Sequence, residues 1–155
     1  MRDYWQRVVL LVLALTATEV GCWAAFAPRS FYNDFPGGGR HWVATDGLYN
    51  EHLVRDVGEL NLALAVVTIV AVVTLAPIVV RAAAAAWLVY SVPHLVFHLR
   101  HLHPYTSGNK VLLTGALVIP IALALVALVL ERPRRTSSAK MEASTPTTRS
   151  SASST

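Results

Sequence analysis

The chain has 155 residues, of which 54% are hydrophobic and only 14% are charged. Soluble domains usually carry about 25% charged residues, so this composition excludes an ordinary soluble fold. The single cysteine, Cys22, excludes an internal disulfide framework. The net charge of +4 comes from basic residues beside apolar runs and not from a basic patch, so we expect no nucleic-acid partner.

Four apolar segments are long enough to cross a membrane, which takes about 20 mostly apolar residues. They cover residues 8–27, 58–80, 82–99 and 111–130, with Arg81 in a tight turn between the second and the third. The sequence therefore predicts an all-α membrane protein, a four-transmembrane-helix bundle in one domain of residues 1–131. The lipid bilayer is its immediate partner.

The first apolar segment has a second interpretation. Arg2 and Arg7 precede it, and Ala25-Phe26-Ala27 near its end resembles a signal-peptidase site. A retained helix is favoured, because the segment is long for a signal sequence and contains Glu19.

The basic residues predict the orientation. An even number of spans puts both termini on one side, and positive residues favour the cytoplasm. That side would carry Arg2, Arg7, Arg81, Arg132, Arg134, Arg135 and Lys140. The other side would carry Arg29, Arg40, Arg55, Arg100 and Lys110, several of them near acidic residues or histidines. We therefore expect a protein of the inner (plasma) membrane with both termini cytoplasmic and one structured extracytoplasmic loop, 28–57. The tail, 132–155, is rich in Ser and Thr with few large apolar residues, which predicts disorder.

The loop 28–57 carries three consecutive glycines, 37–39, followed by Arg40, His41 and Trp42. They do not form a phosphate-binding loop, because no Gly-Lys-Ser/Thr follows them. From about Leu48 the pattern becomes helical and leads into the second span, so this helix is expected to project beyond the bilayer.

Polar residues recur at helical spacing on the projecting helix and on the third span. Residues three and four apart in a helix share one face. The projecting helix has His52, Arg55, Asp56 and Glu59. The third span has Trp87, Ser91, His94, His98 and His101, and the first has Glu19.

Depth predicts that these groups converge. At about 1.5 Å per residue, His94 lies about 18 Å beyond Ala82 and His98 about 24 Å beyond it, in the outer half of the third span. Glu59 and Glu19 fall at similar heights. Ionisable residues in a span cost roughly 2.5–3.5 kcal/mol, so they usually face the bundle or water.

These residues predict a ligand site with three open interpretations. In the first, His94 and His98 hold a metal ion that His52, Asp56 or Glu59 completes. In the second, His52 and His98 face each other across a haem. In the third, an imidazole or carboxylate serves a quinone between aromatic walls. Supporting candidates are Glu19, Arg55, His101, Trp42 and Tyr49.

The leading function is therefore a redox-associated or ligand-binding membrane protein with an extracytoplasmic pocket. The alternative is a non-catalytic accessory or structural subunit, whose polar stripe bonds to a membrane-protein partner. Proton-coupled transport is less favoured, because four helices without an inverted repeat do not resemble a transporter. No Gly-x-Ser-x-Gly or comparable motif indicates a nucleophilic enzyme.

Two stretches carry a resemblance to a known group. Tyr-Asn-Glu-His-Leu-Val-Arg-Asp-Val-Gly (49–58) enters the second span, and Val-Pro-His-Leu-Val-Phe-His-Leu-Arg-His (92–101) closes the third. This layout resembles small actinobacterial membrane proteins and is broadly similar to the DoxX-like group over about the first 130 residues. The resemblance implies a four-helix bundle and a redox setting, and it implies no catalytic residues.

Overall fold

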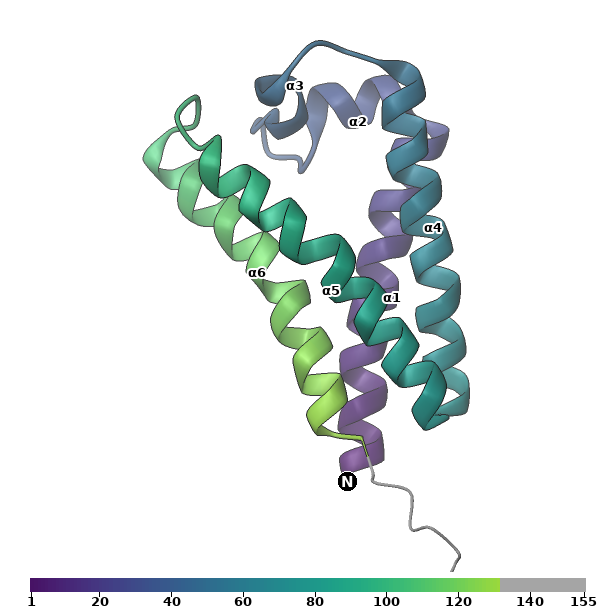
Figure 1. The fold of residues 1–155 in the computed structure, drawn as a ribbon. Coiled ribbons are helices and arrows are strands. Elements are labelled where there is room, and N and C mark those ends of the chain that lie inside the picture. Colours follow the sequence, from purple (N-terminus) through teal and green to yellow (C-terminus); the bar gives the residue numbers. More distant parts are fainter. Residues whose placement is uncertain (132–155) are drawn as a thin grey trace, which may run out of the picture.

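The computed structural model describes residues 1–131, and the tail predicted to be disordered, 132–155, lies outside the described residues. Every regular element in residues 1–131 is a helix (Figure 1). In chain order they are α1 (Arg2–Phe26), α2 (Pro28–Asp34), α3 (Trp42–Asp46), α4 (Glu51–Thr74), α5 (Pro77–Arg100) and α6 (Ser107–Val129). Four of them, α1, α4, α5 and α6, are long and apolar enough to span a membrane, which confirms the predicted fold class. The chain is a multi-pass membrane protein.

The turn between the second and third spans differs from the prediction. The helix α4 ends at Thr74, and α5 begins at Pro77, so Arg81 lies inside α5 and not in the turn. The cause is local: a proline suits the first position of a helix and disfavours helical geometry in the residue before it. Leu75, with φ of 48°, completes the reversal in the left-handed region.

Capping residues explain two of the other helix starts. The Asn50 side chain accepts a hydrogen bond from the backbone N–H of Leu53 at 3.1 Å, so α4 starts at Glu51. Thr106 accepts from the N–H of Asn109 at 3.4 Å at the start of α6. Both side chains satisfy a backbone donor that the first turn of a helix leaves without a partner. The helix that leads into the second span therefore begins within the loop predicted for 28–57.

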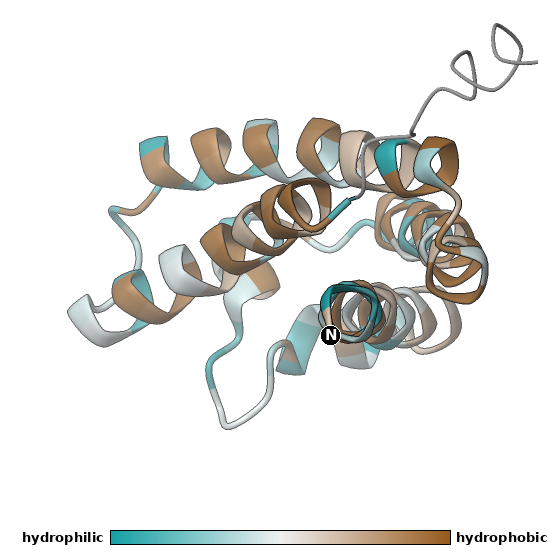
Figure 2. Ribbon diagram, turned by 90° about the horizontal axis from the view of Figure 1, so that it is seen from below, coloured by the Kyte–Doolittle hydropathy of each residue, from teal (hydrophilic) through white to brown (hydrophobic). Residues whose placement is uncertain are grey.

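The four long helices form two pairs that diverge. Figure 1 shows α1 beside α4 and α5 beside α6, with the pairs close together at the N-terminal end and apart at the end that carries α2 and α3. Figure 2 shows the same tilt from below, where α1 and α4 are seen nearly end on while α5 and α6 extend sideways. We call the two ends the narrow end and the wide end.

Glycine allows α1 and α4 to lie in close contact. A Cβ added at Gly58 would lie 2.4 Å from the backbone nitrogen of Ala25. One added at Gly21 would lie 2.9 Å from the side chain of Leu62. Small residues at a helix interface let membrane helices pack backbone to backbone, so this pair is held along much of its length.

The hydrophobic core is shared by all four long helices at the narrow end and in the middle, and it separates into smaller clusters at the wide end. The shared part includes Leu10, Leu13 and Trp87. At the wide end, one cluster joins Phe31 of α2 to α1 and α4. Another joins Trp42 of α3 to the α5–α6 loop and α6. Phe35 packs against both clusters and joins them at the loop end.

Arginines hold the narrow end together. Arg2 donates to a backbone carbonyl oxygen in the last turn of α6 at 2.9 Å, and Arg7 to carbonyl oxygens in the last turn of α4. Arg81 forms an ion pair of 2.7 Å with Glu131, just past α6. Cations at helix C-termini are favourable because the carbonyl groups there carry partial negative charge. The contacts of Arg2 also place both ends of the described chain on the same side.

Candidate functional site: a cavity between the helix pairs

A cavity of about 330 Å³ occupies the space between the two helix pairs at the wide end. All six helices contribute to its walls, with Val20, Phe31, Trp42, Val57, Tyr90 and Leu117 as one example from each. Its volume lies at the lower end of the range for small-molecule sites, about 300–1,000 Å³. Most of the lining is aliphatic or aromatic, so the cavity suits an apolar molecule.

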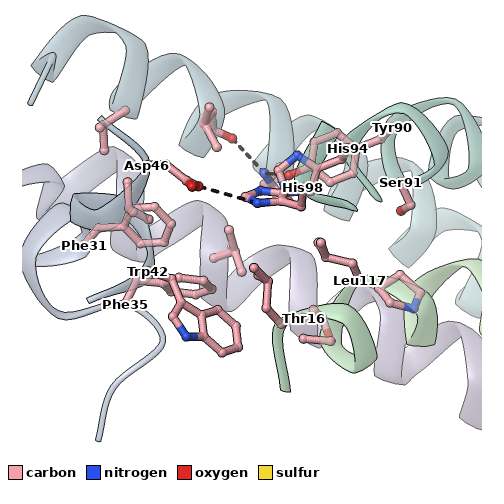
Figure 3. A pocket seen from close by; sticks show the side chains of 18 of the residues that line it. Thr16, Phe31, Phe35, Trp42, Asp46, Tyr90, Ser91, His94, His98 and Leu117 are labelled. Carbon is pink, nitrogen blue, oxygen red and sulfur yellow. Dashed lines mark hydrogen bonds and ion pairs between the residues drawn. The ribbon is translucent and has the colours of Figure 1, made fainter. Parts of the chain in front are cut away.

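Aromatic rings form two of the walls (Figure 3). Phe31 and Phe35 pack at 4.6 Å between ring centroids, and Trp42 meets Phe35 edge to face at 6.2 Å. On the α5 side, the rings of Tyr90 and His94 stack at 5.5 Å. Pairs of this geometry hold ring planes in place, so a flat ligand would meet prearranged surfaces.

Asp46, the last residue of α3, brings a carboxylate to the cavity. Its Oδ2 lies 3.5 Å from Nδ1 of His98 on α5, and Figure 3 shows the carboxylate directed at this ring. The Tyr105 hydroxyl donates to Oδ1 of Asp46 at 2.6 Å and lies 3.0 Å from the carbonyl oxygen of Trp42. Asp46 therefore links α3 to both α5 and the α5–α6 loop.

The surroundings of Tyr105 keep it protonated. Burial, the hydrogen bond to Asp46 and the charge of Asp46 raise the pKa of Tyr105 above its ordinary value of 10.0. The phenol thus acts as a fixed donor to the carboxylate at neutral pH.

A second polar contact lies deeper in the cavity. The Asn61 amide of α4 donates to the Tyr90 hydroxyl of α5 at 3.2 Å and to the Val57 carbonyl at 2.8 Å. The amide nitrogen has two protons, and both are used, while the Tyr90 hydroxyl keeps its own proton to donate.

Three buried polar atoms around the cavity have no hydrogen bond. In residues 1–131 the buried side-chain atoms without one are Trp42 Nε1, Ser91 Oγ, His98 Nδ1 and Glu131 Oε1. The first three belong to residues that line the cavity and are 4–8% exposed. Buried polar groups in native proteins are usually hydrogen-bonded, and each exception needs an explanation. For His98 Nδ1 the neighbouring Asp46 carboxylate, at 3.5 Å, supplies one. For Trp42 Nε1 and Ser91 Oγ, a bound molecule that carries polar atoms would supply one.

The structure divides the predicted site residues into two groups. His94 and His98 line the cavity with their rings 4.7 Å apart, and the supporting candidate Trp42 lines it too. His52 and Asp56 lie on the outside of α4, 89% and 45% exposed, with His52 Nε2 3.4 Å from Asp56 Oδ2. Glu59 is exposed as well. The five candidates therefore do not form one group.

The remaining supporting candidates lie outside the cavity lining. Glu19 is exposed on α1, and His101 bonds to the carbonyl of Phe97 in its own helix. Arg55 pairs with Glu51 at 2.9 Å, and Tyr49 donates to the same carboxylate at 3.2 Å. These contacts stabilise the start of α4.

The structure does not bring together the sets of residues named for the metal site and for the haem site. No group of three or more His, Cys, Asp or Glu side chains within the described part of the chain is close enough to hold one ion. His52 does not face His98 across a haem, because it lies on the exposed surface of α4. The helix α4 is rotated about its axis so that Leu53, Val57 and Asn61 face the cavity and His52 faces away from it.

Sequence reasoning missed Asp46, Asn61 and Tyr90 as site residues. Asp46 belongs to a five-residue helix, too short for any periodic pattern to indicate its direction. Ser91 also lines the cavity, and its helical spacing from His94 and His98 did indicate that the three residues share a face. Tyr90 lies beside this face and reaches the cavity because its ring stacks on His94.

No protein-family model, curated protein or solved structure matches the chain. The resemblance to the DoxX-like group therefore stays a prediction.

Proposed function

We propose that this protein binds a lipophilic small molecule with hydrogen-bond-accepting oxygens in the cavity between its helix pairs, and that the ligand class is the quinones. The observation that carries the proposal is a pair of buried atoms without a hydrogen bond, Trp42 Nε1 and Ser91 Oγ, in residues that line one apolar cavity.

The chemistry of the lining favours acceptors on the ligand. An indole N–H only donates, a serine hydroxyl can donate, and the Tyr90 hydroxyl has a proton to give. A quinone offers two carbonyl oxygens on a flat ring, which matches donors placed between aromatic walls. The cavity volume of about 330 Å³ leaves room for such a headgroup. A quinone ligand would make the protein redox-associated.

The proposal places the cavity on the extracytoplasmic side of the plasma membrane, with both termini cytoplasmic. The support is the distribution of basic residues, since positive residues favour the cytoplasm. The narrow end carries Arg2, Arg7 and Arg81, and the sequence after α6 adds Arg132, Arg134, Arg135 and Lys140, against Arg29, Arg40, Arg55, Arg100 and Lys110 on the other side.

Two probes of the same shape test the proposal. Menadione (2-methyl-1,4-naphthoquinone) carries two carbonyl oxygens, and 2-methylnaphthalene carries none. We expect menadione to quench the tryptophan fluorescence of the protein in lipid nanodiscs saturably, because Trp42 and Trp87 line the cavity. We expect 2-methylnaphthalene to bind about tenfold more weakly, which corresponds to about 1.4 kcal/mol.

Matched variants locate the site. Ser91→Ala should weaken menadione binding several-fold and leave 2-methylnaphthalene binding unchanged, because it removes one polar group and little volume. Trp42→Phe should weaken menadione binding more than 2-methylnaphthalene binding, because it removes the indole N–H together with part of the ring. His52→Gln, on the exposed face of α4, is the control and should bind menadione as the wild type does. Equal affinities for the two probes would contradict the proposal, as would the absence of binding.

The accessory-subunit alternative makes a different prediction. It requires a stable membrane-protein partner that co-purifies in mild detergent, and Ser91→Ala and Trp42→Phe should then reduce recovery of the partner.

A further inference from the structure

A second, smaller cavity adjoins the first on the loop side. Its volume is about 190 Å³, and its outer walls include Tyr32, Leu48 and Asn50. Leu48 is 98% exposed, so this outer cavity opens at the surface of the loop end of the molecule. We call the larger cavity of about 330 Å³ the inner cavity.

One titratable residue lies in the wall shared by the two cavities. Val43, Asp46, Leu53 and Val54 line both of them, and Asp46 alone among these four is ionisable. Its carboxylate has His98 of the inner cavity at 3.5 Å and the Tyr105 hydroxyl at 2.6 Å. Asp46 is thus placed between an apolar site and an opening toward water.

A histidine beside a carboxylate suits proton transfer. An imidazole can take a proton at one ring nitrogen and release one from the other. A neighbouring carboxylate stabilises the imidazolium that forms in between. The 3.5 Å separation exceeds a hydrogen bond but is within the distance of an ion pair, so protonation of His98 would strengthen the contact.

Few other charges act on this pair. His94 lies on α5 with His98, and His101 follows the last residue of that helix. Tyr105 donates a hydrogen bond to Asp46, and Tyr32 lines the outer cavity. The residues that α1, α4 and α6 contribute to the inner cavity, such as Thr16, Asn61 and Leu117, are not ionisable.

We propose that Asp46 and His98 exchange protons between a hydroxyl group of the ligand in the inner cavity and water in the outer cavity. This inference rests on the proposed function and narrows the ligand to quinones or quinols with an ionisable hydroxyl. In the step, the ligand O–H bond breaks as an N–H bond forms on Nε2 of His98, while Nδ1 faces Asp46, whose carboxylate stabilises the imidazolium. The imidazolium then passes a proton by way of Asp46 to water, so the net products are the ligand oxyanion and a hydronium ion.

A coloured acid tests this exchange. The neutral and anionic forms of 2-hydroxy-1,4-naphthoquinone differ in visible absorbance, so a stopped-flow pH jump on the bound probe reports the rate at which its proton leaves or returns. In wild-type protein in nanodiscs, this rate should exceed the separately measured rate of probe dissociation. In Asp46→Asn and in His98→Gln it should fall by at least about tenfold.

The chain offers a matched control in the His52–Asp56 pair, which has the same chemistry on the exposed face of α4. Asp56→Asn should keep the wild-type exchange rate. If wild-type exchange is no faster than dissociation, or if Asp46→Asn and His98→Gln exchange at the wild-type rate, the proton-exchange proposal is overturned while menadione binding still supports the proposed function. If neither probe binds, the proposed function fails, and this inference fails with it.

Discussion

At the scale of single residues, the sequence predicted that His94 and His98 lie together on one face of a helix, but it did not predict that Asp46 lies beside them. His94 and His98 belong to a helix long enough for spacing to predict that they share a face. Asp46 lies in a short helix between the glycines 37–39 and Gly47, and its position depends on contacts with Tyr105 and His98. A carboxylate placed by tertiary contacts alone leaves no periodic signal in the sequence.

Tyr105 is the residue whose loss should disturb this carboxylate most directly. Tyr105→Phe removes the 2.6 Å hydrogen bond to Asp46, and a hydrogen bond to a charged group contributes about 1.5–3 kcal/mol. We expect the free energy of unfolding to fall by an amount of this order. Thermal unfolding in detergent at neutral pH, followed by circular dichroism, measures it.

The same tyrosine predicts a pH dependence. Its pKa is raised above 10.0 in the folded protein, so the folded state holds this proton more tightly than the unfolded state. The resulting stabilisation is complete below pH 10.0 and is lost as pH rises through the folded pKa. In alkaline titrations of the absorbance at 295 nm, the step removed by Tyr105→Phe should lie above pH 10.0, the ordinary value for tyrosine. A step at or below pH 10.0 would contradict the raised pKa.

At the scale of elements, close contact between α1 and α4 depends on Gly58. Gly58→Ala would place a Cβ 2.4 Å from the backbone nitrogen of Ala25, where no side chain can rotate away. Overpacking of this kind costs about 1–3 kcal/mol and occasionally more. Thermal unfolding should show the loss. Gly115→Ala on α6, where an added Cβ meets nothing within 4 Å, is the control and should not destabilise the protein.

A buried hydrogen bond joins α4 to α5. The Trp87 indole donates to the Thr68 hydroxyl at 3.0 Å, and both residues are at most 2% exposed. Thr68→Val keeps the shape but leaves the indole N–H without a partner, which costs about 1–3 kcal/mol. The control is Thr18→Val, because the Thr18 hydroxyl bonds within its own helix. Equal melting temperatures for the two variants would contradict a role for this bond in holding the helices together.

At the scale of the whole molecule, the divergence of the two helix pairs creates the cavity. The narrow end is closed by Leu10 and its neighbours and by the arginine contacts, whereas the wide end is held apart by α2 and α3. The helix α2 packs on α1 and α4, and α3 packs on α2 and reaches the α5–α6 loop and α6 through Trp42. The loop therefore has a structural role in addition to the residues that it contributes to the cavity.

The orientation of the molecule is testable through single cysteines. In a Cys22→Ser background, Leu48→Cys at the wide end should react with a membrane-impermeant maleimide in intact cells. Thr74→Cys at the narrow end should react only after the cells are opened. The reverse labelling would place the cavity on the cytoplasmic side and would contradict the proposed topology.

The sequence by itself determined the fold class. Runs of about 20 apolar residues must be helical where no water can satisfy the backbone, and this requirement acts locally, without reference to other segments. Local rules also explain the turn before Pro77 and the caps at Asn50 and Thr106. They predicted that His94 and His98 share a face, because one helix carries both.

Only the tertiary structure decided which faces meet. The rotation of α4 directs His52 and Asp56 outward and Asn61 inward, and the packing of α3 places Asp46 beside His98. Depth along a helix follows from the number of residues, but rotation about its axis depends on how all the helices pack together. Four apolar helices in lipid leave many rotations nearly equal in hydrophobic burial, and close contacts such as that at Gly58 choose among them.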